Sequence, residues 1–114
     1  MCSAPFAPIV VAKQSFLNQT GTVATTTLFT PSADGDFLVC ITSDCNSAGG
    51  GAQGVLSWTD DFASPENQFN ITHDSAENNF VQPMHVLSGD PITISAEENS
   101  SGTTYSIYAI VIQI

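Results

Sequence analysis

Positively charged side chains are almost missing from this sequence. Lys13 is the only Lys or Arg among 114 residues, against 11 Asp and Glu, so the formal net charge is −10. Proteins that bind nucleic acid or anionic lipid neutralise phosphate groups with several Lys or Arg side chains. We therefore predict no nucleic-acid and no membrane partner, and we expect a surface built from Ser, Thr, Asn, Gln and acidic residues.

The sequence also lacks the patterns of a helix, a membrane span and a secreted precursor. Apolar residues do not recur at helical spacing, and no stretch approaches the ~20 apolar residues that a spanning helix needs. The first residues, MCSAPFAPIVVAKQS, have no basic start, so we predict no signal peptide. The length of 114 residues is typical of one domain.

Residues for catalysis and metal binding are equally few. The two histidines, His73 and His85, occur in no hydrolase or metalloprotease motif and at no zinc-ligand spacing with a cysteine. We expect His73 to be solvated at a strand end and His85 to lie at a surface or interface. Cys40, in FLVCI, is predicted to be a buried thiol, while Cys45 follows in a loop; a Cys40–Cys45 bridge stays open. We predict no enzyme and no cofactor.

Two further hypotheses concern titratable groups. Asp60, Asp61 and Asn67 flank one loop and offer oxygen ligands to Ca²⁺, but they lack EF-hand spacing, and solvated acidic residues are the favoured interpretation. His85 would make an assembly sensitive to pH if it lay between chains.

What the sequence does contain is a series of short strands rich in β-branched residues. Turn clusters such as PSADGD, SGDP and ENSSGT separate the apolar runs. We predict eight strands, at residues 8–15, 22–30, 36–43, 54–60, 68–74, 79–87, 91–96 and 103–114. This spacing predicts an all-β fold, an antiparallel β-sandwich. A jelly roll of about eight strands is preferred to an immunoglobulin sandwich, because the Cys and Trp pattern of immunoglobulin domains is missing.

The last predicted strand, TYSIYAIVIQI, is apolar on both faces. Alternate residues of a strand point to opposite sides of the sheet. One side here carries Tyr105, Ile107, Ala109, Val111 and Gln113, and the other carries Ser106, Tyr108, Ile110, Ile112 and Ile114. An exposed apolar stripe of this kind is typical of an interface. Two interpretations stay open: neighbouring copies cover the stripe, or loops of the same chain do.

Three segments then point to a family. TTTLFTPSADGDFLVCIT, VLSWTDD and VLSGDPITISAEENSSGTTYSIYAIVIQI resemble a recurrent domain of tailed-bacteriophage virion proteins. That domain is similar to the trimeric jelly rolls of the complement globular head and the tumour-necrosis-factor superfamily. The resemblance covers roughly residues 20 to 114. It departs from the family pattern where Phe37-Leu38 and Gln113 stand in place of common arginines, so contacts of those arginines are not expected here.

The resemblance implies a non-enzymatic structural protein on the exterior of a phage virion, made in the host cytoplasm. We expect a homotrimeric capsid decoration protein that contacts other virion proteins, such as the major capsid protein. Residues 1–20 are predicted to be an N-terminal arm or first strand, and residues 21–114 the jelly-roll domain. The trimer interface is predicted at Tyr105, Tyr108, Ile110, Ile112 and Ile114, and the attachment arm at Phe6, Ile9 and Val10.

The alternative hypothesis is a tail-tip or fibre module that binds a receptor or a glycan. Such a module needs aromatic side chains in its loops, because sugar rings stack on them. The candidates for this ligand loop are Trp58, Phe62 and Phe69, which lie in or beside the segment DDFASPENQF.

Overall fold

The computed structural model describes residues 8–46, 50–73 and 78–114, and it contains the eight strands that the turn clusters predict. Phe6 and Cys2 lie outside the described residues. Among the described residues, no helix has the length and hydropathy to cross a membrane. The strands are β1 (Ile9–Thr20), β2 (Thr22–Phe29), β3 (Gly35–Cys45), β4 (Ala52–Ser57), β5 (Glu66–Ile71), β6 (Asn79–Val86), β7 (Ile92–Glu98) and β8 (Thr104–Gln113).

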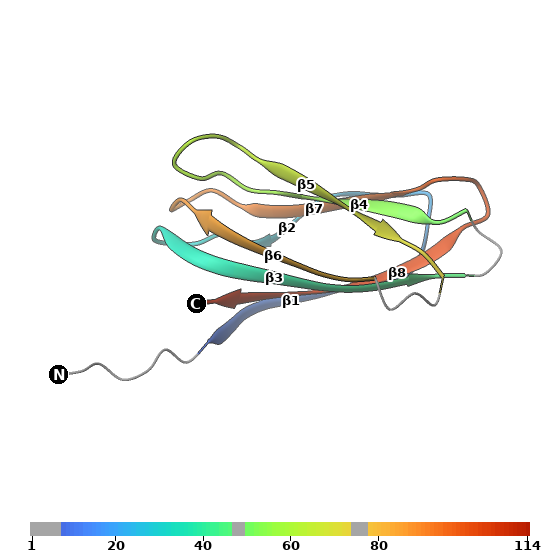
Figure 1. The fold of residues 1–114 in the computed structure, drawn as a ribbon, viewed down its shortest axis with the longest axis horizontal. Coiled ribbons are helices and arrows are strands. Elements are labelled where there is room, and N and C mark those ends of the chain that lie inside the picture. Colours follow the sequence, from blue (N-terminus) through green and yellow to red (C-terminus); the bar gives the residue numbers. More distant parts are fainter. Residues whose placement is uncertain (1–7, 47–49, 74–77) are drawn as a thin grey trace.

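The strands form two four-stranded antiparallel sheets that stack as a sandwich (Figure 1). Sheet A has the order β1-β8-β3-β6, and sheet B has the order β2-β7-β4-β5. The chain crosses from one sheet to the other at every connection except the β4–β5 hairpin. This is the strand order of a jelly roll, as the sequence predicts.

The core lies between the sheets and takes alternate residues from each strand. In β3 the inward side chains Phe37, Val39 and Ile41 are at most 2% exposed, and in β7 Ile92 and Ile94 are at most 1% exposed. Each such side chain contributes about 1.5–3 kcal/mol when it leaves water. The period of two in the sequence therefore fixes which face of each strand is inside.

The strand β8 lies in the interior of sheet A, between β1 and β3. It pairs with β1 from Thr104 to Gln113 and with β3 from Tyr105 to Gln113. Its inward side chains are all buried, at 1% exposure: Tyr105, Ile107, Ala109 and Val111. Half of its apolar character is thus explained by the core, and the other half lies on the outer side of the sheet.

One edge of sheet A, the strand β1, pairs irregularly. The edge strand β1 has register shifts between Val10 and Ala12 and between Phe16 and Gln19, and Asn18 has a φ of 52°. These bulges break the alternation of apolar and polar residues, so the sequence predicts an end at residue 15 whereas β1 continues to Thr20. Residues 9–20 are consequently an integral strand of the sandwich.

The two described cysteines correct the sequence interpretation. Cys45 is the last residue of β3 and is buried, with its Sγ 3.9 Å from the carbonyl oxygen of Ile71, whereas a loop was predicted. Cys40 is half-buried on the outer side of sheet A. An odd number of positions separates the two along one strand, so their side chains point to opposite faces and they do not bridge each other; Cys40 is a free thiol.

Candidate functional site

The outer side of sheet A is a largely apolar surface, which we call the A face. It is built from rows of residues that lie opposite one another on neighbouring strands. One row is Val10, Ile112, Leu38 and Pro83; the next is Lys13, Ile110, Cys40 and Val81; the third is Ser15, Tyr108, Thr42 and Asn79. The first two rows, except for Lys13, present only apolar groups and one thiol.

Solvent reaches much of this surface. Val81 is 56% exposed, Val10 is 48% exposed and Tyr108 is 37% exposed, while Ile110 and Ile112, on the same side of the sheet, are half-buried. Beyond the ladder, Leu17 is 63% exposed and lines a shallow depression with Thr42 and Tyr108. Isolated exposed apolar residues are common, but a contiguous group on one face is typical of a contact surface.

The outer side of sheet B, the B face, differs in composition. Its rows join β7, β4 and β5 through Glu97, Gln53 and Asn70, through Ser95, Val55 and Gln68, and through Thr93, Ser57 and Glu66. Val55 is the single apolar residue in these rows. Hydroxyl and amide groups that bond water cover this side of the molecule, as the composition predicts.

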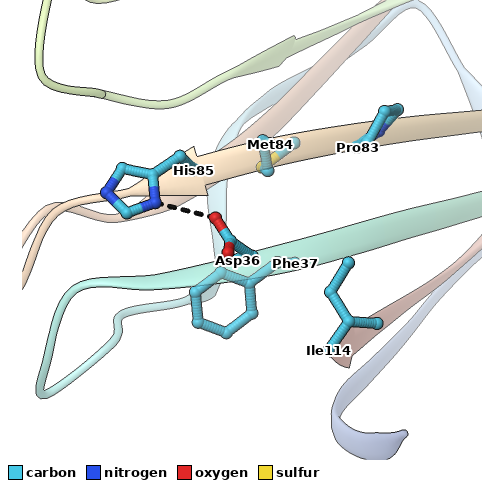
Figure 2. A pocket seen from close by; sticks show the side chains of 6 residues that line it. All are labelled: Asp36, Phe37, Pro83, Met84, His85 and Ile114. Atoms are coloured by element: carbon cyan, nitrogen blue, oxygen red, sulfur yellow. Dashed lines mark hydrogen bonds and ion pairs between the residues drawn. The ribbon is translucent and has the colours of Figure 1, made fainter.

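A groove of about 580 Å³ lies at the end of the A face where β3 begins and β6 ends. Figure 2 shows the residues that line it: Asp36, Phe37, Pro83, Met84, His85 and Ile114. The lining is apolar apart from Asp36 and His85, which face each other across the strand pair. None of the described residues that line the groove carries a hydroxyl or thiol group.

The groove's charge centres on His85, which lies between two carboxylates. Its Nδ1 is 2.8 Å from Oδ1 of Asp36, and its Nε2 is 3.8 Å from Oδ2 of Asp61 (Figure 2 draws the first contact). The hydrogen bond to Asp36 raises the pKa of His85 above its ordinary value, and the charges of Asp36, Asp61 and Asp34 act in the same direction. Both ring nitrogens are therefore oriented toward anions, an arrangement that favours the imidazolium.

The loop that follows β4 is held by an acidic side chain and presents one aromatic ring. Oδ1 of Asp60 accepts hydrogen bonds from the backbone N–H groups of Phe62 and Ala63, at 2.8 and 2.9 Å. Phe62 is 95% exposed at this loop. Asp60 thus caps the loop. Among residues 8–46, 50–73 and 78–114, no three His, Cys, Asp or Glu side chains gather as a metal site.

The predicted ligand loop is not assembled as a cluster of exposed aromatics. Trp58 is only 8% exposed and Phe69 only 5%, and both belong to the core. The ring of Phe69 stacks on that of Phe80, with centroids 5.5 Å apart. Period two from the buried Leu56 places Trp58 inside, a signal that the sequence contained. Phe62 alone remains available to a ligand.

The predicted interface residues divide between the two faces of β8. Tyr108, Ile110 and Ile112 lie on the A face, and Ile114, which is 42% exposed, lies at the groove beside it. Tyr105 lies in the core at 1% exposure, with its hydroxyl donating to the carbonyl oxygen of Gly21 at 2.8 Å. Burial raises the pKa of this Tyr105 hydroxyl. Tyr105 is thereby removed from the side chains that a neighbour can contact.

The predicted arm and the missed residues complete the A face. Ile9, at 60% exposure, and Val10 begin β1, opposite Gln113 and Ile112. The sequence reasoning missed Leu38, Cys40 and Val81 as members of the surface. Their signal is present in FLVCIT, because β3, like the terminal strand, is apolar on both faces.

Comparison with known proteins finds similarity among solved structures. No family model matches the chain, and no curated protein matches it. Among solved structures, BiXyn10A CBM1 in its apo form superposes with a TM-score of 0.51 at 7% sequence identity. The superposition covers 85% of this chain and 60% of that chain, so this chain spans less than two thirds of its length. At this identity the likeness shows a shared β-sandwich fold.

Proposed function

We propose that this chain is a non-enzymatic structural protein of a phage virion, a homotrimeric decoration protein whose copies meet through the A face. The observation that carries the proposal is the pair of adjacent apolar rows across sheet A, centred on Ile110 and Ile112. Covering apolar surface contributes about 25 cal/mol per Å². The resemblance to trimeric phage jelly rolls supplies the expected number of copies.

The strand order supports the same proposal. β8 and β3, the two interior strands of sheet A, are the two strands that are apolar on both sides. A monomer needs only the inner side for its core, so the outer side has a use in association. A heterologous contact repeated around a threefold axis closes a ring and leaves no copy uncovered. Attachment to other virion proteins would then use Ile9 and Val10 at the start of β1.

The experiment measures the mass of the purified protein by light scattering and compares two matched variants. The wild type is expected at three times 12.0 kDa. Ile110→Asp places a charge in the centre of the A face and is expected to yield monomers. Val55→Asp places the same charge on an interior strand of the B face and is expected to leave the mass unchanged. A monomeric wild type would refute the proposal.

A second candidate function, binding of a receptor or glycan, rests on Phe62. Its ring is 95% exposed on a loop that Asp60 holds in place, which suits stacking against a sugar ring. The test is a glycan array with the wild type and Phe62→Ala, in which binding that disappears in the variant supports this function. Asp90→Asn, a change at a half-buried position that directly follows the turn at residues 88–89 and carries no aromatic ring, is the control.

A further inference from the structure

Lys13 is the one cation of the A face. It lies on the edge strand β1 opposite Ile110, in the row that continues to Cys40 and Val81, and its side chain is exposed. Within the described part of the chain it makes no ion pair. Lys13 is the only Lys or Arg of a chain with 11 acidic residues. It nevertheless lies without an acidic partner on the A face, the surface that becomes buried if the proposed trimer forms.

Burying this ammonium group requires a partner. A charge that leaves water without an opposite charge is strongly unfavourable, whereas a pair with good geometry offsets most of that cost. The neighbours of Lys13 in its row are Ile110 and Cys40, which carry no charge. A copy that covers the A face must therefore bring a carboxylate to Lys13.

The groove at the opposite edge of sheet A provides such a carboxylate. Asp61, on the loop after β4, lies beside the lining residue His85: 60% of its side chain is exposed, and its Oδ2 is 3.8 Å from Nε2 of His85, beyond hydrogen-bond distance. Asp36 is already engaged by Nδ1 of the same ring at 2.8 Å. The apolar lining includes the exposed side chains of Pro83 and Ile114, which suit the methylene stem of a lysine, because such a stem covers apolar surface while its charge reaches an anion.

The positions of the two groups also suit association of copies. Lys13 belongs to β1 and the groove adjoins β6, the two opposite edges of sheet A. A heterologous contact joins different patches of identical chains, so each copy can donate one Lys13 and receive another. In an isologous contact, two copies are related by a twofold axis. Lys13 of each copy would then have to reach the groove of the same partner copy.

We propose that Lys13 of one copy enters the groove of the next copy and pairs with Asp61, so that this ion pair fixes how the A faces dock. The inference rests on the proposed function, because it specifies the contact made by the same surface. Lys13 is then a specificity-determining residue of self-association. The apolar rows stabilise any arrangement that covers them, whereas the Lys13–Asp61 ion pair forms in only one arrangement of the two copies.

The test is a charge-reversal cycle measured by sedimentation equilibrium on the full chain. Lys13→Glu and Asp61→Lys are each expected to weaken association at least about 30-fold, because like charges then meet in a buried contact. The double variant, which has the wild-type net charge, is expected to recover most of the affinity. Circular dichroism and melting of dilute samples verify that every variant folds.

A matched control separates the pair from net charge. Gln68→Glu with Asn70→Asp, on β5 at the B face, lowers the net charge by two, as Lys13→Glu does. This variant is expected to change association less than about threefold, the size of a screened surface effect. The inference is overturned if Lys13→Glu behaves like this control, or if the double variant is no tighter than the weaker single variant. A monomeric wild type would refute the proposed function itself.

Discussion

The two sheets of this molecule have similar inner faces and different outer faces. Inside, both present Ile, Val, Leu and aromatic side chains that are almost completely buried. Outside, sheet B presents hydroxyl, amide and carboxylate groups, whereas sheet A presents two apolar rows interrupted by Lys13. Folding accounts for the similarity, because each sheet must bury one face. The folding of one chain does not require the outer faces to differ, so we attribute the apolar outer face of sheet A to contacts with other molecules.

The strongest way to break the comparison is to show that the inner faces are unequal. Ile107→Ala in β8 and Leu56→Ala in β4 each remove a side chain that is at most 1% exposed, one from each sheet. Both are expected to lower the free energy of unfolding by about 2–5 kcal/mol, the loss typical of core truncation. Urea denaturation of dilute protein measures it. A loss below about 1 kcal/mol in either variant would contradict a shared core.

A smaller effect is expected at a gap that sheet B uses to seat an aromatic ring. Gly54 lies opposite Phe69, and a Cβ at Gly54 would approach that ring to 2.1 Å. Gly54→Ala is expected to lower the free energy of unfolding by about 1–3 kcal/mol through overpacking. Phe69→Leu in the same chain should recover part of this loss relative to the sum of the single variants. If the losses of the two single variants simply add in the double variant, as measured by thermal melts, the Phe69 ring moves aside without cost and the overpacking explanation is wrong.

Outer-face substitutions sharpen the comparison, because they should affect association and spare folding. Ile112→Thr with Val81→Thr is expected to change the unfolding free energy of dilute protein by about 1 kcal/mol or less, since both side chains are partly solvated. Binding of a hydrophobic dye should fall in the same variant. Val55→Thr on the B face serves as the control, with no fall in dye binding. Equal responses on both faces would remove the distinction.

The smallest expected effect is a dependence of stability on pH at the groove. Because the folded-state pKa of His85 is raised, its contribution is fully present below the unfolded value of about 6.5 and is lost as pH rises through the folded value. Wild-type stability should therefore fall more steeply above pH 6.5 than that of His85→Gln, as followed by denaturation midpoints. Asp36→Asn, which removes the hydrogen-bonded carboxylate, should flatten the profile in the same way.

The sequence predicts the architecture well, since each strand has its own turn signals and its own alternation. All eight predicted strands exist, within a few residues at each end for seven of them. The exception is the end of β1, where the bulge between Phe16 and Gln19 adds residues that have no partner. A period of two cannot reveal a bulge, because the extra residue reverses the pattern locally.

The candidate surface could be predicted only in part, because it depends on which strands become neighbours. The apolar outer side of β8 is visible in the sequence. The A face exists because Leu38 and Cys40 of β3 lie beside it, and Val81 beyond them. The β3–β8 pairings join residues about 70 positions apart and the β3–β6 pairings residues about 40 positions apart, and no local pattern encodes them. The ligand-loop prediction is wrong for Trp58 and Phe69, although a local pattern does indicate where they lie. Both residues follow the period of two that core residues show, and this period places their rings inside the sandwich.

The irregular edge strand β1 and the proline in the edge strand β6 have a consequence for copies that are packed closely together. A regular edge strand has unpaired N–H and C=O groups that can pair with a strand of another chain, and repeated pairing of this kind produces fibres. Pro83 in β6 lacks an N–H group, and the bulged β1 cannot offer an even series of donors and acceptors. These features disfavour the addition of further strands to the edges of sheet A. Contacts between copies are then left to the faces of the sheets, and such contacts stop once each face is covered.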